Sequence, residues 1–167
     1  MRALIIGLLK ERVIEYAEEF SKSEKLKRIC LFLLLGVLVF IIHKKWFIPF
    51  LDWYVDTVHC HTPFGYPGIS VLWYALFVGL PLLSAFIIGI VTVPTGFKGL
   101  LHKQFPPKEM KVYKPTAIRR GWQGNLKSIF HLLVPALLIL CAVWGYFQVG
   151  QMPHKVPADF DYSVCTS

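Results

Sequence analysis

The sequence predicts an all-α integral membrane protein in which three transmembrane helices follow an amphipathic N-terminal helix. Two observations carry this prediction: three long apolar stretches, and positive charge concentrated on one side of them. Of the 167 residues, 55% are hydrophobic and only 17% are charged. Because each crossing of a bilayer takes about 20 apolar residues, three crossings leave no room for a separate soluble domain of ordinary size.

The first segment, residues 1–25, is expected to form an amphipathic helix. Apolar side chains recur at helical spacing from Ile5 onward to Phe20, and charged residues fill the other face. That polar face is mainly acidic, which favours packing on the chain's own basic loop over lying among lipid headgroups. The opening apolar run is short for a signal peptide, and Lys10-Glu11-Arg12 follows it, so we expect it to be retained.

The first crossing is predicted over residues 26–51. Its uninterrupted apolar part, 29–42, is shorter than a full span, and His43-Lys44-Lys45 separates it from a second apolar run. We expect one helix whose lysines reach toward the far headgroups, with residues 46–51 lying along that interface. Residues 52–68 are then an outer loop.

The second and third crossings, 69–94 and 128–149, contain no Asp, Glu, Lys or Arg. Pro81 is expected to kink the second helix, and Pro135 lies in the first half of the third. Small residues in a membrane helix let a neighbouring helix approach closely. The second crossing contains three of them that mark a helix-packing surface: Ser84, Ala85 and Gly89.

The distribution of positive charge predicts the orientation. Lysines and arginines number seven before the apolar part 29–42 of the first crossing, two directly after that part, eight in the loop 95–127 and one in the tail 150–167. The positive-inside rule therefore places the N-terminus and the loop 95–127 in the cytoplasm, and the tail on the opposite side. We expect a bacterial inner membrane, with the C-terminus in the periplasm.

Two cysteines, Cys60 and Cys165, lie on the predicted outer side, where thiols are oxidised. A disulfide between them would tie the tail to the outer loop. The alternative is two unpaired thiols, because a bridge depends on a Cα separation that the sequence does not give. His59 and His61 are ligand types for zinc or copper, but their spacing follows no metal motif, so neither a metal nor a cofactor is expected.

The loop 95–127 combines prolines that resist helix formation with a dense set of cations. Its position between membrane spans favours binding to anionic phospholipid, each cation adding about 1 kcal/mol. Docking of a membrane-protein partner is the second interpretation, and nucleic acid is not expected. The residues assigned to lipid or partner binding are Lys98, Lys103, Lys108, Lys111, Lys114, Arg119, Arg120 and Lys127.

The chain contains none of the common catalytic signatures of hydrolases, zinc proteases or nucleotide-binding enzymes. The sequence therefore predicts a non-enzymatic accessory, assembly or immunity-type subunit, with a membrane-protein partner or a second copy of itself. Two other classes remain open. A homo-oligomeric channel would be lined by Ser84, Thr92, His131 and Gln148. A lipid-modifying enzyme at the outer interface would use Asp52, Asp56, His59 and His61.

Overall fold

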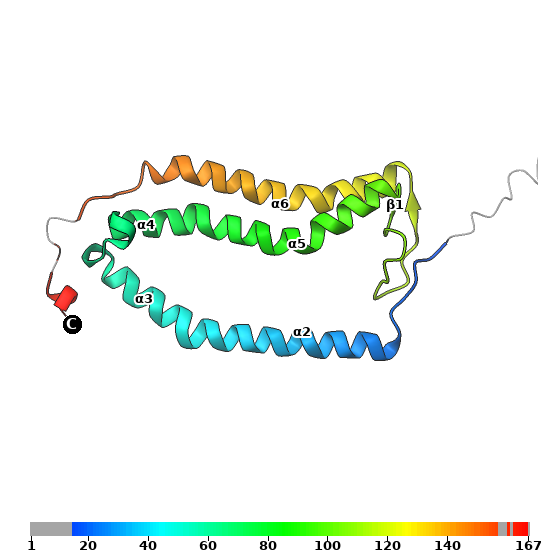
Figure 1. Ribbon diagram of the computed structural model, residues 1–167, viewed down its shortest axis with the longest axis horizontal. Helices are drawn as coiled ribbons and strands as arrows, with labels where there is room; N and C mark the ends of the chain where they lie inside the picture. Colours follow the sequence, from blue (N-terminus) through cyan, green and yellow to red (C-terminus); the bar gives the residue numbers. More distant parts are fainter. Residues whose placement is uncertain (1–14, 157–159, 161, 167) are drawn as a thin grey trace, which may run out of the picture.

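The computed structural model of the chain describes residues 15–156, 160 and 162–166. Among these residues, three helices are long and apolar enough to cross a membrane, and they run alongside the long axis of the molecule (Figure 1). This confirms the prediction of a mainly helical chain with three candidate spans. The three helices are Lys22–Asp56, Gly68–Leu101 and Trp122–Val149.

The first long helix consists of α2 (Lys22–Ile42), a π-helical segment (His43–Phe47) and α3 (Ile48–Asp56). It begins at Ser21, whose hydroxyl accepts the Glu24 backbone N–H at 3.2 Å while the Glu24 carboxylate accepts the Ser21 N–H at 2.8 Å. This reciprocal capping box satisfies two backbone donors at the helix start. The predicted interfacial segment 46–51 instead continues the helix, which bends toward α4 (Figure 1).

The second long helix consists of α4 (Gly68–Tyr74), a π-helical segment (Ala75–Gly79) and α5 (Leu80–Leu101). Pro81 was predicted to kink this helix; close to it the structure has the π-helical segment, which ends two residues before the proline. The proline ring excludes the carbonyl of the residue four positions earlier, which is Phe77. The regular ladder of hydrogen bonds is therefore interrupted before Pro81.

Both helices around the basic loop are longer than predicted. The second extends past 94 to Leu101, and α6 (Trp122–Val149) begins six residues before the predicted start at 128. The apolar pattern breaks at Lys98 and Lys127, but both side chains are exposed, so the helices continue past them. The loop 95–127 is thus reduced to 102–121. It contains a short antiparallel pair, β1 (Gln104–Phe105) and β2 (Arg119–Arg120).

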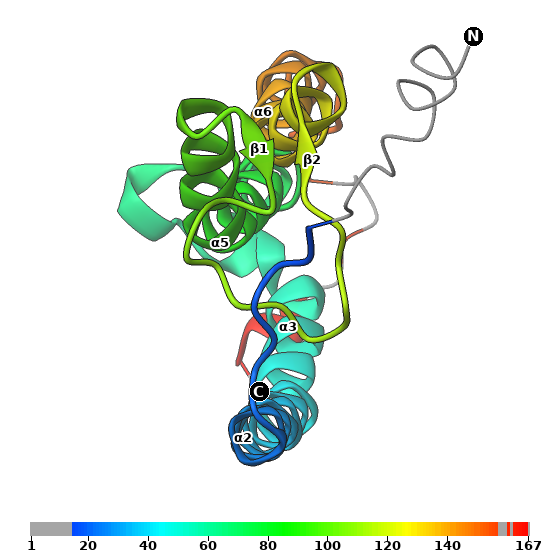
Figure 2. The same ribbon diagram turned by 90° about the vertical axis from the view of Figure 1, so that its right-hand side faces the viewer.

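The predicted N-terminal helix is wrong for residues 15–20, and its residues 1–14 lie outside the described part of the chain. Residues 15–20 are extended and run between two arms of the loop 102–121 (Figure 2). The Ala17 N–H donates to the Thr116 carbonyl at 3.0 Å, and the Val112 N–H donates to the Glu18 carbonyl at 2.8 Å. These hydrogen bonds to the loop replace those of a helix, which begins only after Ser21. We call residues 15–20 and 102–121 together the clasp.

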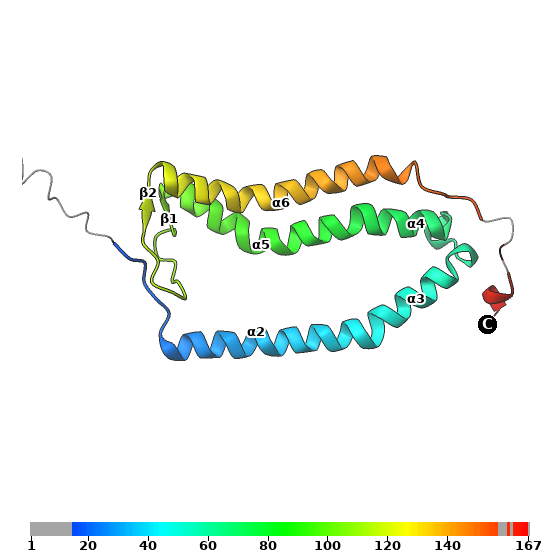
Figure 3. The same ribbon diagram turned by 180° about the vertical axis from the view of Figure 1, so that it is seen from behind.

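The three long helices are not packed equally. α5 and α6 lie against each other along their length, whereas α2 stands apart from both (Figures 1 and 3). Neither α2 nor α3 contains a buried residue. The first helix is joined to the other two at the clasp and, at the opposite end, at the turns 57–67, which we call the disulfide end.

Candidate functional site

An apolar groove of about 510 Å³ lies between α3 and the second long helix, near the disulfide end. This volume is within the roughly 300–1,000 Å³ that is usual for ligand pockets. Tyr54 is the one lining side chain with a polar group, and its hydroxyl donates to the Gly68 carbonyl at 3.2 Å. The groove therefore suits an apolar occupant. Its main lining residues are Phe47, Phe50, Leu51, Leu72, Ala75, Leu76, Gly79, Leu80 and Leu83.

The two π-helical segments both contribute to the groove. Phe47 ends the first segment, while Ala75, Leu76 and Gly79 belong to the second. A π-helical turn widens the helix locally and is frequent at functional sites. Ala75 has a small side chain and Gly79 has none, so neither residue fills the groove. The groove thus follows from backbone irregularity combined with small residues.

Three basic or ionisable side chains, His43, Lys44 and Lys45, directly precede the groove on the first helix. The His43 ring stacks on Phe47, with ring centroids 5.2 Å apart. All three side chains are exposed, and within the described residues none has an ion-pair or hydrogen-bond partner. Ionisable residues inside a spanning helix are costly and mark functional positions. Their place beside the groove is therefore a second feature of the site.

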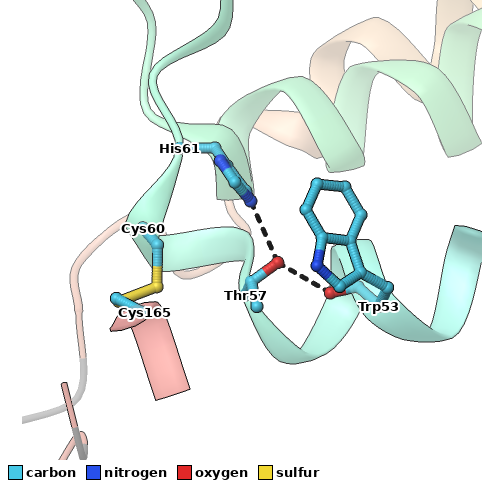
Figure 4. The surroundings of a disulfide bond; sticks show 5 residues. All are labelled: Trp53, Thr57, Cys60, His61 and Cys165. Atoms are coloured by element: carbon cyan, nitrogen blue, oxygen red, sulfur yellow. Dashed lines mark hydrogen bonds between the residues drawn. A yellow bond between two sulfur atoms is a disulfide. The ribbon is translucent and has the colours of Figure 1, made fainter. Parts of the chain in front are cut away.

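At the disulfide end, Cys60 and Cys165 form a disulfide, with Cα atoms 5.5 Å apart (Figure 4). Of the two alternatives that the sequence leaves open, the structure contains the bridge. It joins the turn Val58–Cys60 to the C-terminal turn Tyr162–Thr166. Neither sulfur is then a free thiolate for a metal, and the described residues contain no cluster of three potential metal ligands.

His61 connects the turn beside the disulfide to the end of α3 through a hydrogen bond and a ring contact. The Thr57 hydroxyl donates to the Trp53 carbonyl at 2.7 Å, so it accepts a hydrogen bond from His61 Nε2 at 3.0 Å (Figure 4). The imidazole proton is accordingly on Nε2. The His61 ring also lies 4.9 Å from that of Trp53. These contacts explain His61 as a residue that holds the turn in place.

The four residues of the enzyme alternative are not joined in one network. Asp52 and Asp56 are exposed on α3, and no described interaction connects either carboxylate to a histidine. His59 packs edge-on against the Phe160 ring, with centroids 5.0 Å apart. Among the described residues, no hydrogen bond or ion pair joins any two of these four side chains, and the enzyme alternative stays a prediction.

The segment after α6 folds back onto α4 through His154. Its Nε2 lies 2.9 Å from the Val149 carbonyl, which only accepts, so Nε2 carries a proton. In the neutral ring, Nδ1 then accepts from the Ser70 hydroxyl at 2.9 Å. The Trp73 indole N–H also donates to the Pro153 carbonyl at 3.1 Å. No sequence pattern predicts the contacts of Ser70 and Trp73, because they join residues 84 and 80 positions apart.

In the clasp, two of the cations assigned to lipid or partner binding are paired with the chain's own carboxylates. Lys111 lies 3.3 Å from both Glu18 and Glu24, and Arg120 bonds to Glu15. The hydrogen bonds that the Lys111 ammonium donates to the Glu18 and Glu24 carboxylates raise the pKa of Lys111. Because the pKa of Lys111 is higher in the folded protein than in the unfolded chain, its pairing stabilises the fold fully at any pH below the unfolded pKa of this lysine. This stabilisation is lost as the pH rises through the pKa that Lys111 has in the folded protein.

The other assigned cations have different surroundings. Arg119 donates to the Gln123 side chain at 2.6 Å, and Lys127 lies 5.8 Å from the centre of the Phe105 ring. Among the described residues, the remaining lysines have no ion-pair partner. They are free to meet an external anion. These residues are Lys98, Lys103, Lys108 and Lys114.

The predicted helix-packing residues lie mainly between α5 and α6 of this chain. Ala85 is buried, and a side chain on Gly89 would meet Pro135 at 3.7 Å. The Ser84 hydroxyl instead donates to Leu80 in its own helix, at 2.9 Å. A close approach at Gly145 was not predicted: a Cβ there would lie 2.2 Å from the Phe77 carbonyl oxygen.

Several polar side chains of the channel alternative form hydrogen bonds with backbone carbonyls of their own helix. The Thr92 hydroxyl donates to the Ile88 carbonyl at 3.0 Å, within the same helix. His131 Nδ1 lies 2.8 Å from the Lys127 carbonyl and therefore donates to it, and its ring lies 4.9 Å from that of Phe105. The His131 ring thus contacts Phe105, which belongs to the loop 102–121. Such helix-internal bonds are usual for polar groups in membrane helices.

Comparison of the chain with protein-family models, with curated proteins and with solved structures finds no match in any of the three.

The disulfide leads to a labelling prediction. Denatured but unreduced protein is expected to react with maleimide only at Cys30 and Cys141, the two free and exposed cysteines. Reduction should raise the number of labels to four, counted by intact mass. Four labels before reduction would contradict the bridge.

Proposed function

We propose that the protein is a small non-enzymatic accessory subunit of a membrane complex, and that it receives a transmembrane helix of its partner in the apolar groove. The observation that carries the proposal is the open groove between two candidate spans, one of which has no buried residue. In a membrane, apolar side chains gain little from leaving lipid, so close packing must drive association. Small residues at the groove allow such packing.

The charges beside the groove support a more specific partner. Lys44 and Lys45 have no counter-ion among the described residues, although they lie inside a helix long enough to span the bilayer. A cation in that position is stabilised by an opposite charge on a neighbouring helix. We infer that the partner helix carries an Asp or Glu at the depth of these lysines.

The proposed topology follows the charge distribution. The N-terminus and the clasp lie in the cytoplasm of a bacterial cell, and the disulfide end lies in the periplasm. This orientation is supported by the disulfide between Cys60 and Cys165, because the periplasm is oxidising and the cytoplasm is reducing.

Photocrosslinking in native membranes tests the proposal. A photoreactive amino acid at Phe50 or Leu76, which line the groove, is expected to link to one transmembrane segment of another protein. The same amino acid at Leu140, exposed on α6 outside the groove, serves as the control and should give no such product. Mass spectrometry of the linked peptide should show a segment that contains Asp or Glu. Products with lipid alone, or with a second copy of this chain, would contradict the proposal.

The charge pairing has its own test. Replacement of Lys44 and Lys45 by Glu is expected to remove the crosslink from Phe50, because two carboxylates would then face each other in the bilayer. Changing the partner's carboxylate to Lys should restore it. A crosslink that is unaffected by the Glu replacements would show that the lysines do not contribute to partner binding.

A further inference from the structure

A second hollow, of about 580 Å³, lies at the clasp end between the last turns of α5 and the turn 107–110. Its walls combine apolar and basic side chains. Pro94 and Leu101 belong to α5, where the chain leaves its uncharged stretch, and Lys98 lies between them. The hollow therefore lies where the uncharged part of α5 ends and its first charged residue, Lys98, follows.

A loop residue fixes the hydrogen-bonding state of a histidine in this hollow. The backbone N–H of Lys108 donates to His102 Nδ1 at 3.1 Å. Nδ1 is thus an acceptor, and the proton of the neutral ring is on Nε2. The ring offers one N–H donor in a hollow that Lys98 and Lys108 also line.

The position of Lys108 is set by a tight turn. Met110 N–H donates to the Pro107 carbonyl at 3.2 Å, and Glu109 adopts a φ of 65° within the turn. A non-glycine residue in this left-handed region is uncommon and is held there by its surroundings. The turn therefore brings Lys108 and Glu109 to the same hollow.

We propose that this hollow binds the headgroup of a singly charged anionic phospholipid, with the phosphate on Lys98, Lys108 and His102. The two lysines and the carboxylate of Glu109 give the lining a formal charge that one phosphodiester neutralises. Lys98 and Lys108 have no ion-pair partner among the described residues, in contrast to Lys111 of the same loop. The apolar wall of Pro94 and Leu101 is placed to contact the lipid beyond its phosphate.

The proposal concerns a site that is separate from the partner groove. The groove lies near the disulfide end, whereas this hollow lies at the clasp end. A substitution in one site is therefore expected to weaken binding at that site and to leave binding at the other unchanged, so the two proposals can be tested separately.

The test uses the full chain in non-ionic detergent, mixed with defined lipids and observed by native mass spectrometry. One molecule of phosphatidylglycerol is expected to be retained in preference to phosphatidylcholine. The double change Lys98→Gln and Lys108→Gln should weaken retention by roughly thirtyfold, because each cation near an anionic lipid multiplies affinity about fivefold. The matched control is Lys114→Gln, which alters an exposed lysine of the same loop outside the hollow and should leave retention unchanged.

Three results would overturn the proposal. They are equal retention of the two lipids, equal losses in the double variant and the Lys114 control, and displacement of the lipid by millimolar inorganic phosphate. The last result would assign the hollow to free phosphate in place of lipid. Circular dichroism of the variants excludes unfolding as the cause, since both lysine side chains are exposed.

Discussion

Replacement of Gly145 by Ala is expected to destabilise the packing of α6 on the second long helix by about 1–3 kcal/mol, the usual cost of overpacking. A Cβ at this position would lie 2.2 Å from the backbone oxygen of Phe77. That carbonyl belongs to the residue four positions before Pro81, so the proline displaces it from the helical ladder. Because the obstacle is backbone, no side-chain rotation relieves the clash, and the two helices must move apart.

Gly36→Ala is the matched control, because Gly36 lies in α2 and a Cβ there would meet nothing within 4 Å. This change should be neutral or slightly stabilising, since Ala has a higher helix propensity than Gly by about 1 kcal/mol. Both variants are measured by reversible unfolding in mixed micelles, followed by circular dichroism. Equal unfolding free energies for the two variants would contradict the close approach of α6 to the π-helical segment Ala75–Gly79.

The second large effect is expected from Gly79→Leu, which should abolish or strongly weaken partner binding without unfolding the protein. Gly79 lines the groove, and a Cβ there would meet only the Tyr74 carbonyl at 3.8 Å, an ordinary contact. The Leu side chain is therefore accommodated by occupying space that we assign to the partner helix. A clash of about 1–3 kcal/mol corresponds to roughly a 5- to 150-fold loss of affinity.

The yield of the photocrosslink from Leu76 measures this effect in native membranes. Gly36→Leu adds the same side chain to an open face of α2 and should leave the yield unchanged. Equal yields in the two variants would mean that the partner does not occupy the groove near Gly79.

The sequence allows the three candidate spans to be predicted, because they depend on composition alone. It names Cys60 and Cys165 as the cysteines that could pair, but the bridge depends on a Cα separation that only the structure gives. The start of the first helix was also encoded, in the Ser21-x-x-Glu24 capping box, but the apolar periodicity of residues 1–23 obscured it. Periodicity alone does not distinguish a helix from an extended segment whose backbone bonds go to a distant loop. Residues 15–20 are such a segment.

The groove could not be predicted in the same way. Its lining comes from two helices, and it depends on π-helical segments that leave no clear trace in the order of residues. Gly96 and Gly99 illustrate the related limit for packing: they approach Ser128 on α6 closely, yet Ser128 lies beyond the loop. A sequence shows that a residue is small, whereas the partner that needs the space follows only from the fold.

The measurement that tests the central claim most directly is the native mass of the protein extracted from its own membranes in mild detergent. We predict a defined complex that contains this chain and a different membrane protein, and that is lost in Gly79→Leu but kept in Gly36→Leu. A monomer, or a discrete oligomer of this chain alone, would contradict the proposal that the groove receives a partner helix.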